Sequence, residues 1–332
     1  MIAGISDSPL PTLPEQLLPA SVIARLDRLD MLSRKMLSGT MPGERRSKRR
    51  GRSVEFDDFR DYSPGDDLRH VDWNIYARLD RLFIKLFREE EDLAVNILID
   101  CSASMDVGSP GKLLYAHQLA FGLAHIALSN HDRVSIATFA PPRTPATPVL
   151  SRLTPLRGRR SLHRIGTFLC DSLKTSRSAR PAGSTKPHEA FNEALRSFSL
   201  HIGQRGICIV LSDFLTPASI EPGLAALGTR TMAGHTDTWC IQVLSPQELD
   251  PAAAQSAGLT GDVRLTDIES LDESPVTITP ATIAAYREAF TTARAKFKDA
   301  CSNKGIAYLM VPTDTSLGDL LTQTARRRGL LR

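Results

Sequence analysis

The feature that most limits the possible folds is a succession of short apolar runs from residue 94 onward, separated by stretches with helical spacing. Residues 94–99 are almost continuously apolar, which is typical of a strand covered on both faces of a sheet. The other strand candidates are 133–139, 206–211, 237–244 and 305–311. Strands that alternate with helices favour right-handed crossovers. The sequence therefore predicts an α/β fold, with a doubly wound, mainly parallel sheet over residues 94–332.

Five stretches between or after these runs are predicted to be helical. In one of them Ile283, Tyr286 and Phe290 are three and four residues apart, which makes it amphipathic. Another opens with Ser109 and Pro110, a residue pair that suits a helix start. The expected helices are 109–129, 187–199, 217–228, 280–302 and 315–327. Residues 140–160 and 174–187 are rich in Pro, Ser, Thr and Arg, so they are expected to be loops.

The first 93 residues divide into three parts of different character. Residues 1–40 contain apolar positions at helical spacing over 21–37 and are predicted to form an N-terminal helical arm. Residues 41–53 carry six basic side chains and are interpreted as a basic linker. Residues 54–93 alternate like strands around a Pro-Gly turn, so we expect a small β-rich accessory segment that packs against the larger domain.

Cysteine usage and hydropathy indicate the compartment. The five cysteines are widely spaced and form no C-x-x-C pair, so neither a zinc site nor a disulfide framework is expected. This usage fits a reducing environment. The N-terminus does not read as a signal peptide, and no apolar stretch approaches the ~18 residues of a membrane span. We therefore expect a cytoplasmic protein without a membrane segment.

Short oxygen-bearing side chains follow two of the predicted strands. Asp100, Ser102 and Ser104 come directly after the first buried strand, and Asp213 follows the strand predicted at 206–211. In open parallel sheets, ligands bind at the carboxyl ends of the strands. Thr185, just before the helix predicted at 187, could add a third hydroxyl. Mg²⁺ prefers such oxygens, and neutral hydroxyls leave the ion able to accept a carboxylate from another protein.

The pattern Asp-x-Ser-x-Ser with a downstream Thr and Asp resembles the metal-ion-dependent adhesion site of von Willebrand factor A domains. The resemblance implies a von Willebrand factor A or Rossmann-like fold. It also implies that Asp100, Ser102, Ser104, Thr185 and Asp213 hold Mg²⁺ or Mn²⁺, and that an acidic side chain of a partner protein completes the shell. One departure is Lys186, which stands where an acidic residue is common.

The residues upstream of the Asp-x-Ser-x-Ser pattern resemble a particular family. Pro64-Gly65-Asp66-Asp67, Asp72-Trp73 and Ala77-Arg78 resemble the bacterial family catalogued as domain of unknown function 58. Members of that family often accompany MoxR-type AAA+ ATPases and are thought to act as adaptors or chaperone partners. The resemblance therefore implies a non-catalytic adaptor whose partner is a MoxR-like ATPase or that ATPase's client.

Two other functions stay open at the level of sequence. The first is a Mg²⁺-dependent aspartyl phosphotransferase or phosphatase with Asp100 as nucleophile, although Ser102 stands where such enzymes need a second carboxylate. The second is binding of nucleic acid or an acidic partner through the basic run at 45–52, where steep salt dependence would be diagnostic. We find no H-E-x-x-H, phosphate-loop or G-x-S-x-G motif, and expect no enzyme.

Overall fold

The structure is a computed structural model that describes residues 9–32, 54–89, 93–141, 150–178, 187–203, 206–215, 219–250, 261–266 and 273–332. The chain separates into two compact units. The large unit comprises residues 1–39 and 93–332, and the small unit comprises residues 40–92. The basic run at 45–52 lies outside the described residues.

The large unit is built on a six-stranded sheet with the strand order β10-β7-β6-β3-β4-β5. The strands are β3 (Ala94–Asp100), β4 (Arg133–Phe139), β5 (Leu150–Arg157), β6 (Gly206–Ser212), β7 (Thr236–Leu244) and β10 (Ala307–Pro312). All neighbours are parallel except β5, which runs antiparallel to β4 at one edge. The predicted α/β class with a mainly parallel sheet is confirmed.

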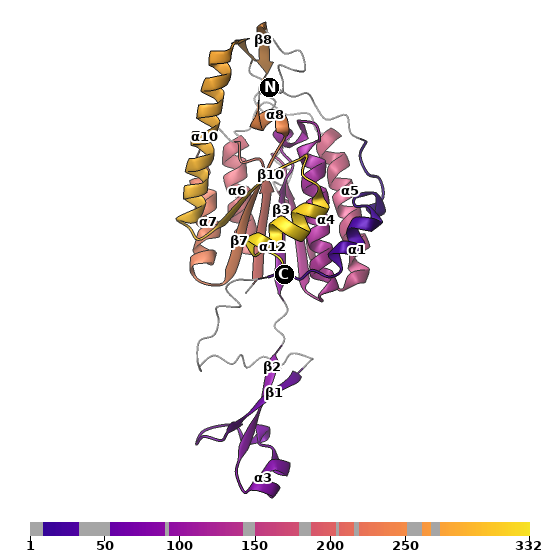
Figure 1. The fold of residues 1–332 in the computed structure, drawn as a ribbon, viewed down its shortest axis with the longest axis vertical. Coiled ribbons are helices and arrows are strands. Elements are labelled where there is room, and N and C mark those ends of the chain that lie inside the picture. Colours follow the sequence, from indigo (N-terminus) through magenta and orange to yellow (C-terminus); the bar gives the residue numbers. More distant parts are fainter. Residues whose placement is uncertain are drawn as a thin grey trace. The chain divides into compact units, whose positions relative to one another are not determined.

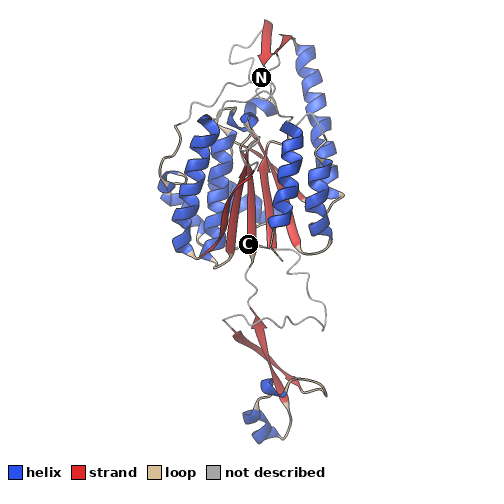
Figure 2. Ribbon diagram, turned by 180° about the vertical axis from the view of Figure 1, so that it is seen from behind, coloured by secondary structure: helices blue, strands red, loops and turns tan. Residues whose placement is uncertain are grey.

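Helices cover both faces of this sheet (Figures 1 and 2). One face carries α1 (Ala20–Leu26), α4 (Lys112–Ser129) and α5 (Leu162–Ser178); the other carries α6 (Pro187–His201), α7 (Glu221–Met232) and α10 (Pro280–Ser302). The alternation of side chains along β3 explains both layers, because Val95 and Ile97 enter the first core and Leu98 enters the second. Strand β3 is therefore buried on both faces, as its apolar sequence indicates.

The connections diverge at the middle of the sheet. From β3 the chain passes through α4 on one face to β4, whereas from β6 it passes through α7 on the other face to β7. Strands β3 and β6 are neighbours, so the winding direction changes between them. Ligands of open α/β sheets bind at the carboxyl ends of the strands on either side of such a switch point.

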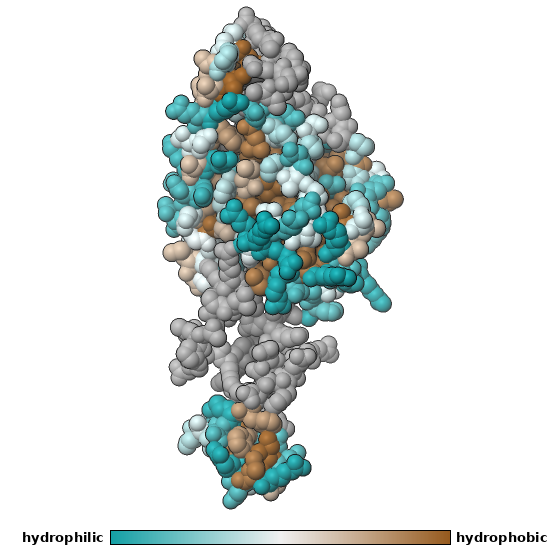
Figure 3. Space-filling view, in the orientation of Figure 1, coloured by the Kyte–Doolittle hydropathy of each residue, from teal (hydrophilic) through white to brown (hydrophobic). Residues whose placement is uncertain are grey.

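The small unit contains a two-stranded antiparallel sheet of β1 (Val54–Asp61) and β2 (Phe83–Glu89). Its expected turn is present, since Asp66 accepts from the Ser63 backbone and pairs with Arg60 at 2.7 Å. Between the strands lies α3 (Trp73–Leu79), which was not predicted; Asp72 caps it by accepting from the Asn74 backbone. Apolar side chains remain exposed on this unit (Figure 3), among them Leu68, Trp73 and Leu79.

The predicted N-terminal arm is corrected in two respects. Helix α1 ends at Leu26 rather than continuing to residue 37, and the chain then passes Met31, which bridges to Leu331. The arm is also not a part of its own, because Leu17, Leu18 and Leu26 are buried in the core of the large unit. Its helical spacing reflects packing onto α4 and the C-terminal segment.

Other differences concern segments that were expected to be loops or were given no structure. Residues 150–157 form β5, whose Pro155 is tolerated because the strand lies at the sheet edge. Helix α5 spans part of the expected loop 174–187. The hairpin of β8 (Gly261–Thr266) and β9 (Glu273–Ile278) was also missed. The C-terminal helix is broken into α11 (Leu317–Asp319), a π turn and α12 (Ala325–Arg328). No helix in the described ranges is both long and apolar enough to span a membrane.

Candidate functional site

The two aspartates predicted at strand ends leave the sheet at the same edge. Asp100 is the last residue of β3, and Asp213 directly follows β6. In the parallel register of these strands Ile99 lies opposite Leu211, so Asp213 lies one residue beyond the position opposite Asp100. The sheet thus brings two carboxylates, more than 100 residues apart in the chain, to its switch point.

Asp100 is buried and held at both oxygens. Its Oδ1 accepts from the Ser102 backbone N–H at 2.9 Å, and its Oδ2 accepts from the Ser212 hydroxyl at 2.6 Å. Burial, followed by the negative charge of Asp213, raises the pKa of Asp100 to about 6, against the lowering effect of these hydrogen bonds. The carboxylate is therefore fixed in position and, without a nearby cation, costly to ionise.

The hydroxyls of Ser102 and Ser104 lie next to each other. A short 3-10 turn over Ala103–Asp106 follows Ser102 and places the two Oγ atoms 3.0 Å apart. Two oxygen ligands at right angles on Mg²⁺, each at about 2.0–2.1 Å, lie about 2.9 Å apart. The spacing fits two adjacent positions in an octahedral shell, and it is also that of a normal hydrogen bond.

Asp213 is oriented by an unusual stretch of backbone. The next residue, Phe214, has a φ of 49°, in the left-handed region that non-glycine residues seldom adopt. Its ring stacks on Phe297 with centroids 4.6 Å apart, and its N–H donates to Ser212 Oγ at 3.0 Å. The resulting reversal lets Asp213 Oδ1 accept from the Leu215 backbone at 3.2 Å. Packing of Phe214 therefore fixes the direction of the Asp213 carboxylate.

Two charged residues that the sequence analysis did not identify complete this edge. Lys112, at the first position of α4, is buried, and its ammonium donates to Asp213 Oδ2 at 2.8 Å and to Glu248 Oε1 at 2.5 Å. Burial alone would lower the pKa of Lys112, but the two carboxylates outweigh burial and raise it. The sequence signal for Lys112 was a charged residue at the start of a largely apolar helix, whereas Glu248, distant in sequence, gave no signal.

The described residues hold four of the five predicted metal ligands. Asp100, Ser102, Ser104 and Asp213 come together at one edge, whereas Thr185 lies outside the described residues. In the part of the chain that is described, no group of three or more His, Cys, Asp or Glu side chains is placed to hold a metal ion. The donor set is instead two carboxylates with two hydroxyls, a combination of hard oxygens that suits Mg²⁺ or Mn²⁺.

Cys101 and His117 are the residue types of a nucleophilic Cys–His pair, but their protonation states are not those of such a pair. Cys101 Sγ lies 3.9 Å from His117 Nε2, and Ser172 Oγ lies within 3.7 Å of both. Burial raises the pKa of Cys101 to about 12 and lowers the pKa of His117 to about 4. At neutral pH the thiol is protonated and the imidazole uncharged, the opposite of an activated thiolate. These residues pack the core.

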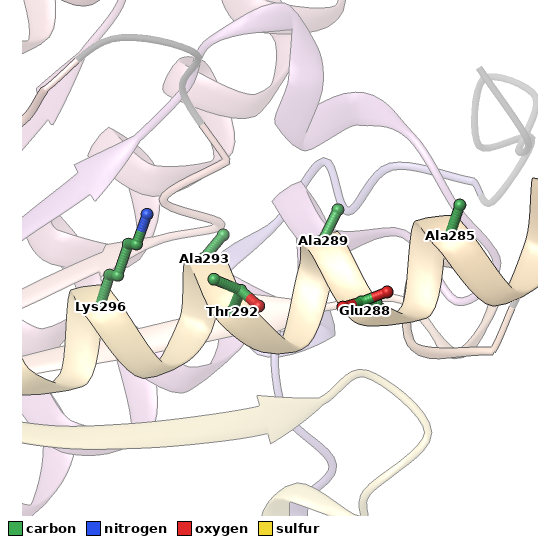
Figure 4. A pocket seen from close by; sticks show the side chains of 6 residues that line it. All are labelled: Ala285, Glu288, Ala289, Thr292, Ala293 and Lys296. Carbon is green, nitrogen blue, oxygen red and sulfur yellow. The ribbon is translucent and has the colours of Figure 1, made fainter.

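A shallow hollow of about 430 Å³ lies along one side of α10 (Figure 4). Its lining consists of residues of that helix alone: Ala285, Glu288, Ala289, Thr292, Ala293 and Lys296. The lining is mostly small side chains, and its two charged groups, Glu288 and Lys296, are two turns apart on the helix. The hollow is thus poorer in convergent polar groups than the switch point of the sheet.

Comparison with known proteins gives relatives without an assigned activity. Uncharacterized proteins of Mycobacterium tuberculosis and Mycobacterium bovis are 27% identical over 314 residues, covering 93% of this chain and 90% of theirs. Among solved structures, an aerotolerance-related membrane protein from Bacteroides fragilis covers 72% of this chain and 98% of its own, with 16% identity and a TM-score of 0.34.

The pilus adhesin SpaC from Lactobacillus rhamnosus GG matches 74% of this chain and 31% of its own, with 9% identity and a TM-score of 0.38. Because both TM-scores are low, neither structure supports an argument about the fold or function of this chain. The profile of the family described as "Protein of unknown function DUF58" matches residues 58–299, most of the chain. The chain belongs to the DUF58 family.

Proposed function

We propose that this chain is a non-catalytic adaptor that binds a partner protein through a divalent cation at the carboxyl edge of a von Willebrand factor A-like sheet. The ion, Mg²⁺ or Mn²⁺, would be held by Asp100, Ser102, Ser104, Thr185 and Asp213. The observation that carries the proposal is the meeting of Asp100 and Asp213 at the switch point, beside two hydroxyls spaced like neighbouring ligands.

The kinds of ligand around the ion explain how it could accept a partner's acid. Direct ligands from Ser102 and Ser104 are neutral, and both Asp100 oxygens already accept hydrogen bonds within the protein. A cation bound mainly by hydroxyls and water keeps most of its positive charge and supplies a site for an incoming carboxylate. Binding, rather than bond cleavage, is what this arrangement favours.

A MoxR-type AAA+ ATPase, or a client of such an ATPase, is the partner we propose. This step depends on the family's association with those ATPases rather than on a contact in the structure. The requirement it must meet is chemical: the partner has to present an Asp or Glu side chain that can approach the edge formed by β3 and β6.

The first test is binding of the metal alone. We expect purified protein to bind Mn²⁺ in an electron paramagnetic resonance titration and Mg²⁺ to compete. The paired substitution Ser102→Ala and Ser104→Ala should weaken binding at least about tenfold, because it removes two of the three neutral hydroxyl ligands. Thr185→Ala tests the fifth ligand in the same assay. Asp299→Asn, an exposed residue on α10, is the matched control and should bind as the wild type does.

The second test is partner capture from a bacterial lysate with Mg²⁺ or EDTA. The wild type should retain an ATPase of the MoxR type only with Mg²⁺, and Asp100→Asn should retain none while keeping its far-ultraviolet circular dichroism spectrum. Capture that EDTA leaves unchanged would contradict the proposal. Metal-dependent hydrolysis of a small phosphate ester, abolished by Asp100→Asn, would favour the phosphotransferase alternative instead.

A further inference from the structure

The buried ammonium of Lys112 is hydrogen-bonded to Asp213, one of the two carboxylates proposed to hold the metal ion. Its side chain is 1% exposed, and its Nζ lies 2.8 Å from Asp213 Oδ2. Because the other oxygen of Asp213 accepts from the Leu215 backbone, both oxygens are engaged by groups of the chain itself. A divalent ion that used Asp213 directly would have to share an oxygen with an ammonium group or displace it.

The position of Lys112 is electrostatically unfavourable without these acids. It is the first residue of α4, where the helix dipole repels a positive charge, and it is removed from water. Glu248 supplies the second counter-charge and is itself fixed, since its Oε2 accepts from the backbone N–H and the hydroxyl of Ser245. One ammonium therefore ties together the start of α4, the end of β6 and the short helix α8 (Pro246–Leu249) that follows β7.

The charge balance shows what the ammonium changes. Asp100, Asp213 and Glu248 carry three negative charges when ionised, and Lys112 reduces the total to two. A divalent cation would then bring the cluster to neutrality, whereas without Lys112 the same ion would enter a field of three negative charges. Charges a few ångström apart in a poorly hydrated site interact strongly, so this difference affects affinity.

We propose that Lys112 is a resident cation that weakens and tunes divalent-ion binding at this site by holding Asp213 Oδ2. Asp213 can then contact the metal ion only through its remaining lone pairs or through water, and the ion stays exchangeable. The inference rests on the proposed metal site and assigns a positioning residue to it. If Lys112 only held Asp213 in place, its loss would instead leave the Asp213 carboxylate free to move and would weaken metal binding.

The test compares Mn²⁺ affinity among four forms of the whole chain. Lys112→Met keeps the length and apolar stem of the side chain and removes the charge; we expect its Kd for Mn²⁺ to fall at least about tenfold. Because Lys112→Met leaves two carboxylates without a cation and could impair folding, the double variant Lys112→Met with Glu248→Gln restores the wild-type net charge. We expect it, too, to bind more tightly than wild type. Glu248→Gln alone keeps Lys112 on Asp213 and should not gain affinity.

The outcomes separate the inference from the proposed function. Equal or weaker binding by both Lys112 variants, with the wild type binding, would overturn the role of Lys112 and leave the metal site standing. A double variant that returns to the wild-type Kd would also overturn it, since net charge alone would then account for the effect. If no form binds Mn²⁺, the metal site fails and the inference fails with it. Thermal melts in EDTA check that each variant is folded.

Discussion

At the scale of single residues, two buried titratable groups, Asp100 and His117, respond to pH in opposite senses. Asp100 has a pKa raised to about 6 by burial and by the charge of Asp213. His117 has a pKa lowered to about 4 by burial, although its bond to the Leu113 carbonyl opposes the shift. That carbonyl can only accept, so Nδ1 carries the proton and Nε2 accepts from the Ser172 hydroxyl.

These shifts predict the pH dependence of stability. Between pH 4 and 6 folded Asp100 binds more protons than the unfolded chain does, so its contribution to the free energy of unfolding falls as pH rises. For His117 the folded state binds fewer protons between pH 4 and 6.5, so its contribution rises with pH. Each shift corresponds to about 3 kcal/mol. Urea unfolding in EDTA should therefore show Asp100→Asn gaining stability relative to wild type as pH rises from 4 to 6.

His117→Asn is the matched variant, because its amide can still donate to the Leu113 carbonyl. Relative to wild type it should gain stability as pH falls from 6.5 to 4, the reverse of Asp100→Asn. Parallel curves for all three proteins would show that neither group titrates as its burial indicates. Differences between variants are used because the remaining acids of the chain cancel in them.

At the scale of elements, the N-terminal arm is joined to the large unit by close contacts with α4 and α5. A Cβ added to Gly122 on α4 would lie 2.9 Å from Leu321 Cδ1 and 3.5 Å from Leu26 Cδ1. A Cβ added to Gly166 on α5 would lie 2.4 Å from Pro14 Cβ. Glycine at these two positions lets the arm and the C-terminal segment approach the helices closely enough to seal one face of the core.

The arm should accordingly contribute to global stability. Leu26 is fully buried, so Leu26→Ala is expected to lower the free energy of unfolding by about 2–5 kcal/mol through lost burial and the cavity left behind. Leu200→Ala, at an 82% exposed position at the end of α6, is the control and should change it by less than about 0.5 kcal/mol. Urea titrations followed by circular dichroism measure both. Equal effects would mean that the arm is detached in solution.

At the scale of the whole molecule, the chain consists of two compact units, and the sheet with its helices belongs to the large one. Among the residues whose side chains the structure describes, both buried clusters of the large unit are formed by residues of that unit. A two-stranded sheet with one short helix buries little apolar surface and is marginally stable by itself. The large unit carries the metal-site candidates, so the two units are expected to be separable in stability.

Replacing residues 54–89 by a flexible Gly/Ser linker tests this separation. The large unit should keep its far-ultraviolet circular dichroism spectrum, change its Tm by no more than a few degrees, and bind Mn²⁺ as the full chain does. The physical reason is that both described buried clusters of the large unit are formed by its own residues. An unfolded or aggregated product would show instead that the large unit requires the small one.

The sequence by itself determined five of the six strands described in the sheet, all but β5, and the two aspartates at its edge. Apolar runs such as 94–99 and 206–211 are recognisable because a strand covered on both faces has few polar positions. Parallel strands place their carboxyl ends at one edge, so Asp100 and Asp213 could be assigned to one site. Helix α5 was not predicted, although the sequence indicates it: the apolar residues Ile165, Leu169 and Leu173 are spaced every four residues.

Only the tertiary structure decided which groups surround those aspartates. The pairing of Lys112 with Glu248, 136 residues apart, depends on where the end of β7 lies relative to the start of α4. Residue type alone could not show that the Ser212 hydroxyl fixes Asp100 or that Phe214 turns the backbone beside Asp213. Local spacing determines strands and helices, whereas charge balance at a site is set by long-range packing, which a single sequence does not encode in any local pattern.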